Sequence, residues 1–211
     1  MLTLTGCGED YLQEAPLTDI SDDTVQASEA GAKAAVTGLL RQMQYQYSDL
    51  KNGNLNPNGE YFFSILYGEG LCADTNVGEF TNYFNSACNP NNIRGTSSYW
   101  ATYMYRYCYS IIGSANTILG NIQGDNLTDS QNWLKGCALT MRAHAYWRLM
   151  EVYGPRWVDS QNGEAYALVM RLKSGEDNNN PLNTCNEIYD KMYEDLKTAI
   201  HCFENTTIDR G

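Results

Sequence analysis

Residues 128–155 have the sequence TDSQNWLKGCALTMRAHAYWRLMEVYGP, which carries the signals of one complete helix. Thr128 and Gln131 have the spacing of a capping box, in which each side chain bonds the backbone N–H of the other residue. Apolar residues then recur every three or four positions, as one buried helix face requires, and they are Leu134, Ala138, Met141, Ala145, Leu149 and Val152. Gly154 and Pro155 stop this pattern. The stretch therefore predicts a long helix that packs against other elements.

The chain on the N-terminal side of this stretch predicts two more helices. The first covers residues 22–50, with Ser21 or Asp22 as its cap and with the same apolar spacing. The second covers residues 97–124, where a glycine ends it. Only a short link separates this second helix from the one at 128–153, so the two are predicted to form an antiparallel pair.

The C-terminal side predicts a short extended run and a fourth helix. The extended run lies within residues 156–172. Thr184 and Glu187 form another capping box, which opens a helix over residues 184–203. The predicted fold class is therefore all-α: an array of four long helices with a long irregular loop inserted at residues 51–96.

The inserted loop at residues 51–96 contains clusters of Asn, Gly and Pro, which break the helical pattern. An irregular segment of this length is uncommon inside a compact domain, and it is usually either functional or disordered. Its many aromatic residues argue against disorder. We therefore expect the loop to carry function, although Phe80 or Phe84 could equally serve to pin it onto the helices.

The overall composition restricts the classes of partner. The chain has 25 acidic and 14 basic residues and a formal charge of -11, which repels nucleic acid and anionic lipid surfaces. No apolar run is long enough to cross a bilayer as a helix. The 16 tyrosines, together with tryptophan, phenylalanine and many asparagines, suit contacts with uncharged polar ligands or with other proteins. Composition alone leaves both of these uses open.

Common catalytic and metal-binding motifs are absent from the sequence. It contains no phosphate-binding loop, zinc-protease pair, hydrolase nucleophile elbow or calcium loop. Cys137 and His144 could share a helix face, but a zinc site needs two more ligands, so no metal or cofactor is expected. A pair among Glu69, Asp74 and Glu79 could in principle hydrolyse a glycosidic bond, although acidic residues in loops are more often solvated or turn-forming.

The seven cysteines include no CxxC pair. Cys108, Cys137, Cys185 and Cys202 lie in helical patterns and are interpreted as small buried hydrophobic residues, with disulfides in an oxidising space as the alternative. Cys72 and Cys88 share the long loop and are the favoured pair if one forms. Leu4-Thr5-Gly6-Cys7 has the form of a bacterial lipobox, in which the cysteine becomes lipidated. Too few residues precede Cys7 for a whole signal peptide.

Four pieces of the chain, taken in order, resemble the N-terminal part of the SusD/RagB family of outer-membrane nutrient-binding lipoproteins. These pieces are Cys7 followed by Tyr11 to Pro16 and Ile20-Ser21, then Trp100 to Leu119 with Tyr107, Ile111 and Asn116, then Met141 to Trp147 followed by Tyr153-Gly154-Pro155, and finally Glu187 to Leu196 with Ala199. Each piece is modest alone, and their order over nearly the whole chain carries the resemblance.

The resemblance implies a tetratricopeptide-like helical scaffold and no catalysis. It also implies capture of glycans or other oligomeric nutrients at the cell surface and delivery to a TonB-dependent SusC-like transporter in the outer membrane. Residues 1–20 would be the lipobox and an extended tether, with Cys7 as the lipid anchor. Residues 21–211 would be the N-terminal helical domain of a longer protein, since the family normally continues into a larger C-terminal half.

The ligand-binding residues expected from this interpretation lie in the long loop. Aromatic rings can lie on the apolar face of a sugar while amides and charged groups bond its hydroxyls. The loop supplies this mixture with Asp74, Phe80, Asn82, Tyr83 and Arg94. Two alternatives remain at this point: a helical-repeat adaptor that binds only protein, and a glycoside hydrolase.

Overall fold

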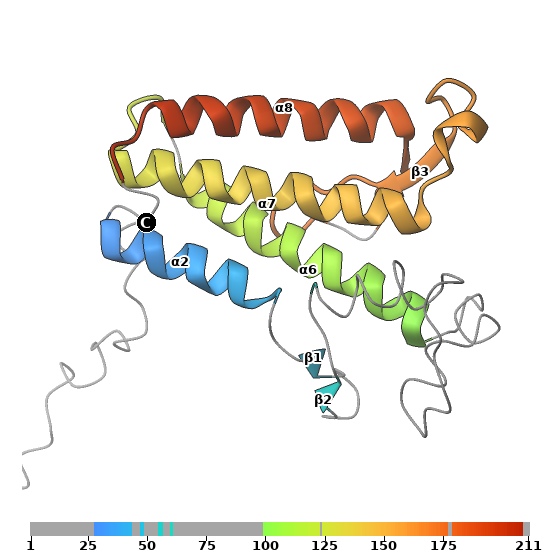
Figure 1. Ribbon diagram of the computed structural model, residues 1–211, viewed down its shortest axis with the longest axis horizontal. Helices are drawn as coiled ribbons and strands as arrows, with labels where there is room; N and C mark the ends of the chain where they lie inside the picture. Colours follow the sequence, from blue (N-terminus) through green and yellow to red (C-terminus); the bar gives the residue numbers. More distant parts are fainter. Residues whose placement is uncertain are drawn as a thin grey trace, which may run out of the picture.

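The computed structural model of the 211-residue chain describes residues 28–43, 47–48, 55–56, 60, 99–122, 124–176 and 179–208. Over these residues the fold is mostly helical, with four α-helices and two small two-stranded antiparallel sheets (Figure 1). The helices are α2 (Glu29–Arg41), α6 (Tyr99–Asn121), α7 (Asp129–Tyr153) and α8 (Cys185–Glu204), with a short 3-10 helix η3 (Trp157–Asp159). The strands are β1 (Tyr47–Ser48), β2 (Leu55–Asn56), β3 (Tyr166–Val169) and β4 (Leu182–Thr184).

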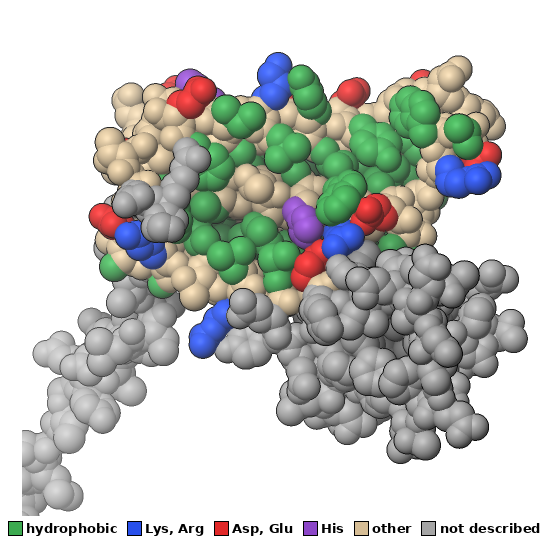
Figure 2. Space-filling model, viewed as in Figure 1, with side chains coloured by type: hydrophobic (Ala, Val, Ile, Leu, Met, Phe, Trp, Pro, Cys, Tyr) green, Lys and Arg blue, Asp and Glu red, His purple; other side chains and the backbone are tan. Residues whose placement is uncertain are grey.

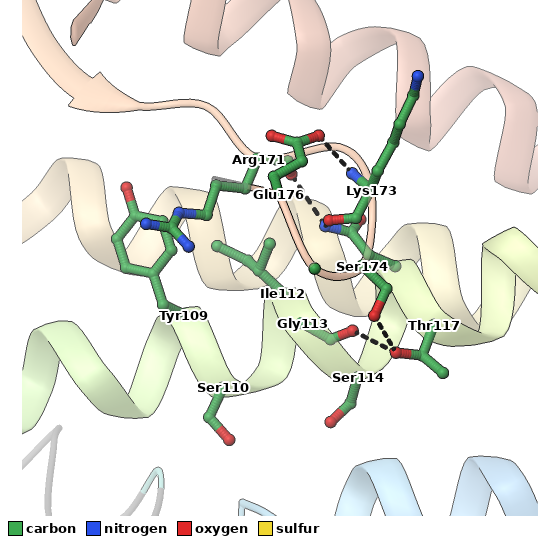
Figure 3. A pocket seen from close by; sticks show the side chains of 12 residues that line it. Tyr109, Ser110, Ile112, Gly113, Ser114, Thr117, Arg171, Lys173, Ser174 and Glu176 are labelled. Atoms are coloured by element: carbon green, nitrogen blue, oxygen red, sulfur yellow. Dashed lines mark hydrogen bonds between the residues drawn. The ribbon is translucent and has the colours of Figure 1, made fainter. Parts of the chain in front are cut away.

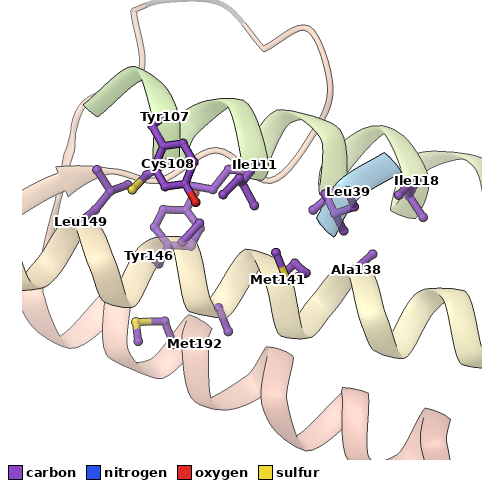
Figure 4. Close-up of a cluster of buried hydrophobic side chains, with 14 of the residues drawn as sticks. Leu39, Tyr107, Cys108, Ile111, Ile118, Ala138, Met141, Tyr146, Leu149 and Met192 are labelled. Atoms are coloured by element: carbon purple, nitrogen blue, oxygen red, sulfur yellow. The ribbon is translucent and has the colours of Figure 1, made fainter. Parts of the chain in front are cut away.

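Helix α7 is the centre of the arrangement. It packs along α8 on one side and against α6 and α2 on the other (Figure 1). Figure 4 shows the side chains that fill these contacts, with Leu39 from α2, Ile111 from α6, Met141 from α7 and Met192 from α8. Burying one such side chain contributes about 1.5–3 kcal/mol, so the shared core holds the four helices together.

Both predicted capping boxes are confirmed. The Thr128 hydroxyl accepts a hydrogen bond from the Gln131 backbone N–H, and the Gln131 side chain accepts one from the Thr128 N–H. Thr184 and Glu187 do the same at the start of α8. Helix α7 ends at Tyr153, as the Gly154-Pro155 signal predicted. Local caps that the sequence specifies therefore set where α7 and α8 begin.

The predicted helix over 22–50 is wrong in its bounds. Helix α2 begins at Glu29, where the Ser28 side chain accepts a hydrogen bond from the Gly31 N–H, and it ends at Arg41. Tyr47–Ser48, which the prediction made helical, is strand β1 and pairs with β2. Beyond Arg41 the Gln42 side chain donates to the Ser114 hydroxyl. The Met43 carbonyl, which the N–H of residue 47 would bond in a continuing helix, accepts instead from the backbone N–H of Glu60.

The predicted extended run after α7 is confirmed as strand β3. It pairs with β4 in an antiparallel register that joins Tyr166 to Thr184 and Val169 to Leu182, with an irregularity between them. The sequence did not predict β4, because three residues carry too little pattern. Helix α6 stops at Asn121, short of the predicted glycine end, and Gly124 follows in the left-handed region at φ 89°.

The four cysteines in the described helices are thiols, and three of them confirm the preferred interpretation as small buried residues. Cys108, Cys185 and Cys202 are buried, and Cys137 is half-buried. Cys72 and Cys88 lie outside the described residues. None of the helices in the described part of the chain is both long and apolar enough to cross a lipid bilayer.

Candidate functional site

The sequence-predicted site residues lie outside the described residues, together with most of the 51–96 loop. They are Asp74, Phe80, Asn82, Tyr83 and Arg94, the alternative acids Glu69 and Glu79, and the lipobox Cys7. The structure does describe Glu60 in that loop, and the helix surface that Glu60 contacts. The place where the loop meets the helices can therefore be built from the residues upward.

Glu60 is fixed to α6 and α7 through both oxygens of its carboxylate. Oε2 accepts a hydrogen bond from the Tyr107 hydroxyl at 3.1 Å and lies 3.3 Å from Nε2 of His144. Oε1 accepts hydrogen bonds from the guanidinium of Arg148. His144 and Arg148 are four residues apart, so one face of α7 presents both side chains to the same carboxylate. We call this group of four residues the Glu60 anchor.

The charges of the Glu60 anchor stabilise one another. Burial alone would raise the pKa of the Glu60 carboxyl, but the contacts with His144 and Arg148 outweigh it and lower that pKa below its ordinary value. Burial by itself would lower the pKa of Arg148, and its bonds to Glu151 and Glu60 raise it instead. The loop is therefore attached to α7 by an ionised pair.

An exposed tryptophan lies beside the anchor. The Arg148 guanidinium lies 4.7 Å from the centre of the Trp147 ring, and the His144 ring lies 5.7 Å from it. The Trp147 side chain is nevertheless 43% exposed. Figure 2 shows histidine, basic, acidic and hydrophobic side chains gathered in the middle of the visible face. The loop thus meets the helices at a surface that combines an aromatic ring with charged groups.

A second polar cluster lies inside the protein and joins α6, α7 and α8. Arg142 of α7 donates to both oxygens of Asp195 of α8, from Nε to Oδ2 at 2.7 Å and from Nη2 to Oδ1 at 2.8 Å. It also donates from Nη1 to Oδ1 of Asn116 of α6 at 2.8 Å. All three side chains are almost fully buried, and Lys191 adds a contact to Asp195 at 3.2 Å. Arg142 and Asp195 therefore form a buried ion pair.

This buried cluster also holds the chain that follows β3. The Asn116 amide donates to the carbonyl of Arg171 at 3.1 Å. The Tyr146 hydroxyl donates to the same carbonyl at 2.8 Å and accepts a hydrogen bond from the Arg171 N–H at 2.7 Å. Burial raises the pKa of Tyr146 to about 12, so its hydroxyl stays protonated and can donate. Glu176 then accepts from the N–H groups of Leu172 and Lys173 and closes the turn.

The turn held in this way forms one wall of a groove, and α6 forms the other (Figure 3). The groove has a volume of about 360 Å³. Arg171 lies over the Tyr109 ring at 5.7 Å, and Thr117 bonds the Ser174 hydroxyl across the groove at 3.0 Å. A neighbouring cavity of about 500 Å³ shares Thr117 and Ser174. The lining combines these hydroxyls and the tyrosine ring with the charged residues Arg171, Lys173 and Glu176, so it suits a small polar group.

The sequence also leaves open a metal held by Cys137 and His144, which would need further ligands. Among the residues that the structure describes, no three His, Cys, Asp or Glu side chains are grouped so that they could hold a metal ion. His144 instead lies against Glu60. The sequence did not reveal that Glu60 attaches the loop to the helices. The only signal was the four-residue spacing of His144 and Arg148, which places two basic side chains on one helix face, where they can share an acidic partner.

Comparisons with known proteins find one matching family and a curated relative. A SusD-like family, described as starch-binding and associating with the outer membrane, matches residues 10–208. A SusD-like protein of Formosa agariphila is 29% identical over an alignment of 155 residues, and the match covers 69% of this chain and 27% of that protein. Thus the chain spans about a quarter of the length of that curated relative.

The fold of the chain also resembles that of solved structures. A putative sugar binding protein from Bacteroides vulgatus superimposes with a TM-score of 0.56 at 24% identity, covering 82% of this chain and 36% of that one. A SusD-like protein from Bacteroides fragilis gives a TM-score of 0.59 at 19% identity, covering 90% of this chain and 32% of that one. The chain therefore corresponds to about a third of these structures.

Proposed function

Because this chain belongs to the SusD-like family, we propose that it captures glycans at the outer surface of a bacterial cell and passes them to a SusC-like TonB-dependent transporter. The observation that carries the proposal is the family match over residues 10–208, since that family is described as starch-binding and as associating with the outer membrane. The captured glycan is not chemically changed, because the role is delivery. Oligomeric nutrients of another kind, such as peptides, remain within the same role.

The scaffold for this function is a tetratricopeptide-like array of helices. Helices α7 and α8 pack along each other, and α6 packs on the opposite side of α7, as stacked helical hairpins do. The likeness to solved SusD-like structures supports this arrangement at the level of the fold. An array of this kind offers a rigid base from which a long loop can present side chains.

The ligand face is the loop at residues 51–96, with Asp74, Phe80, Asn82, Tyr83 and Arg94 as its contacts. Support comes from the Glu60 anchor, which attaches this loop to α7 through charged and hydrogen-bonded side chains. A loop fixed at one point loses less conformational entropy when a ligand orders it, so binding is stronger. The groove between α6 and the 171–176 turn is a second candidate binding site for the same kind of polar ligand.

We infer the cellular location of the protein from the same family. Its members associate with the outer membrane. In this chain Cys7 is the lipid anchor, residues 1–20 form the tether, and residues 21–211 form the helical domain. The lipid is then the only attachment to the membrane.

Affinity electrophoresis tests the capture role directly. The chain with Cys7 replaced by serine, so that no lipid attaches, is run in gels that contain one polysaccharide each, beginning with starch. Retardation by one glycan is expected, and Tyr83→Ala is expected to remove it. Tyr166→Ala is the matched control, because Tyr166 is an exposed tyrosine on β3, and it should migrate like the parent protein.

Other results would contradict the proposal in distinguishable ways. Retardation that survives Tyr83→Ala would move the ligand face away from the loop. Folded protein that no glycan retards, but that binds the transporter, would be a protein-binding adaptor. Release of new reducing ends from the retarding glycan would identify a hydrolase.

A further inference from the structure

The groove between α6 and the 171–176 turn differs in charge from the rest of the protein. The whole chain has 25 acidic and 14 basic residues, yet α6, which forms one wall, contains no acidic residue. The turn that forms the other wall contributes two basic residues to the lining, Arg171 and Lys173 (Figure 3). Positive charge therefore lines a groove on the surface of an acidic protein.

Glu176 is the acidic residue among the described residues of the lining, and both of its oxygens are bonded within the turn. Oε1 accepts hydrogen bonds from the N–H groups of Leu172 at 3.0 Å and Lys173 at 2.7 Å, and Oε2 accepts one from the Asn180 amide at 2.7 Å. Burial alone would raise the pKa of Glu176, but these bonds outweigh it and lower that pKa. Two cations and one anion leave the described lining with one net positive charge.

Two glycines of α6 leave open space beside these charges. Gly113 lines the groove, and Gly120, seven residues later on the same face, lines the neighbouring cavity. A Cβ atom added at either position would meet none of the described atoms within 4 Å. Glycine is less favourable than alanine inside a helix, so packing within the described structure does not explain these two. The cavities, of about 360 and 500 Å³, have the usual size of small-ligand sites.

The basic wall of the groove is held in place from inside the protein. The Arg171 carbonyl accepts hydrogen bonds from the Asn116 amide and the Tyr146 hydroxyl, and the Arg171 N–H donates to that same hydroxyl. The Arg171 guanidinium lies over the Tyr109 ring at 5.7 Å from its centre. A cation that is already positioned loses less conformational entropy when it binds an anion. The groove is therefore preorganised for a negatively charged group.

The other groups of the lining suit a sugar. The Thr117 hydroxyl donates to the Ser174 hydroxyl at 3.0 Å, and the Ser174 oxygen keeps a second lone pair that can accept from a sugar hydroxyl. The Tyr109 ring can lie against the apolar face of a sugar. A carboxylate or sulfate on the same sugar would form charge-assisted hydrogen bonds with basic side chains.

We propose that this groove binds an acidic unit of the captured glycan, that is, a sugar that carries a carboxylate or a sulfate group. Arg171 and Lys173 pair with the acidic group, and Ser174 and the Tyr109 ring contact the rest of the sugar. The proposal rests on the glycan capture proposed above, and it adds the class of glycan and a contact on the helical scaffold.

Affinity electrophoresis with matched polysaccharides tests this specificity. The full-length protein, with Cys7 replaced by serine, is run in gels that contain polygalacturonate or its methyl ester, and dextran sulfate or dextran. Within each pair the sugar backbone is the same and the charge differs. At least one of the two polyanions should retard the protein, and its uncharged counterpart should not. The net charge of -11 repels polyanions in general, so retardation requires a local basic site.

A charge-matched pair of double substitutions locates the contact. Arg171→Gln with Lys173→Gln removes both cations of the groove, and the affinity for the retarding polyanion should fall at least about tenfold. Arg156→Gln with Lys33→Gln removes the same charge from two exposed ion pairs elsewhere, and it should change the affinity by less than about twofold. Equal losses in the two double variants would overturn the proposal.

A further pair of variants tests the open space over α6. Gly113→Leu places a side chain in the groove, whereas Gly38→Leu adds the same side chain at an open position of α2. Gly113→Leu should lower the affinity for the polyanion at least about tenfold, and Gly38→Leu should leave it unchanged. Circular dichroism of both variants should show the helical content of the parent protein. Unchanged affinity in a folded Gly113→Leu variant would overturn the proposal.

The outcomes also separate this proposal from the capture role on which it rests. Retardation by neutral glycans alone would overturn the acidic specificity and leave capture intact. Retardation by none of the polysaccharides, neutral or acidic, would overturn both. Retardation by a polyanion that survives Tyr83→Ala but not the loss of Arg171 and Lys173 would support the groove and contradict the loop as the ligand face.

Discussion

Arg142 on α7 and Asp195 on α8 are 53 residues apart in the chain, yet their side chains meet in a two-bond contact inside the protein. The same guanidinium reaches Asn116 on α6, so one side chain links three helices. Asn116 and Tyr146 then hold the carbonyl of Arg171, which sets one wall of the groove. One buried charged group therefore links the packing of three helices to the wall of the groove.

Removing this group should strongly destabilise the protein. Arg142→Ala leaves the Asp195 carboxylate buried without its main partner, and we expect the free energy of unfolding in urea to fall by about 3–5 kcal/mol. Arg156→Ala is the control, because the Arg156–Asp159 pair is exposed, and it should change stability by less than about 1 kcal/mol. Equal effects of the two substitutions would show that the buried contact contributes little.

The Glu60 anchor should make stability depend on pH in the acid range. The pKa of Glu60 is lower in the folded protein than its ordinary value of 4.5, so the stability it contributes is complete above that value. This contribution is lost as the pH falls through the lower, folded-state pKa. Glu60→Gln should therefore cost about 1–2 kcal/mol at pH 7, and the cost should shrink below about pH 4.5.

Urea titrations of both proteins between pH 7 and pH 3 provide the measurement. Glu29→Gln is a suitable control, because Glu29 forms an exposed pair with Lys33 and should contribute less than about 0.5 kcal/mol at pH 7. A cost of Glu60→Gln that stayed constant over this pH range would show that the carboxylate charge is not what holds the loop.

The cap of α8 should be worth more than a threonine inside the same helix. Thr184→Ala removes the side-chain acceptor of the Glu187 N–H, and we expect a loss of about 1 kcal/mol in unfolding free energy. Thr198→Ala should be neutral or slightly stabilising, because Thr198 lies in the helix interior and alanine has the higher helix propensity. If both variants lost the same stability, the capping box would have no special role.

Among the cysteines of the described helices, Cys137 should react first with a thiol reagent. It is half-buried, whereas Cys108, Cys185 and Cys202 are buried, and burial raises the pKa of these three thiols. Alkylation of the native protein followed by peptide mass spectrometry should give a rate at Cys137 at least about tenfold above that at Cys108. The order should disappear in urea, and its absence in the native protein would contradict the packing around Cys108.

Local signals in the sequence predicted the helices well where a cap defined them. Thr128 and Thr184 are such caps, because capping involves residues only three positions apart. The end of α2 could not be predicted in this way. Met43 continues the apolar spacing, but its carbonyl accepts a hydrogen bond from the N–H of Glu60, which lies beyond β1 and β2 in the chain.

The contacts of the candidate site could not be predicted from local signals either. The sequence offers no spacing that could name Asp195 as the partner of Arg142, because the two residues lie on different helices. Glu60 looked like any solvated acid of a polar loop, and only the folded chain brings it to Tyr107 and Arg148. The predicted ligand residues Asp74 and Tyr83 remain predictions.

The hydrogen bond from the Glu60 N–H to the Met43 carbonyl, at 2.9 Å, has a consequence for how this protein can be altered. It joins the two ends of the excursion that contains β1 and β2, and the Glu60 side chain is already fixed to α7. Extra residues placed between β1 and β2 would thus not change where the chain leaves and rejoins the scaffold. Doubling the length of a flexible loop raises the free energy of closing it by only about 0.6 kcal/mol. The segment between β1 and β2 is therefore a suitable place to insert a new peptide into the helical array.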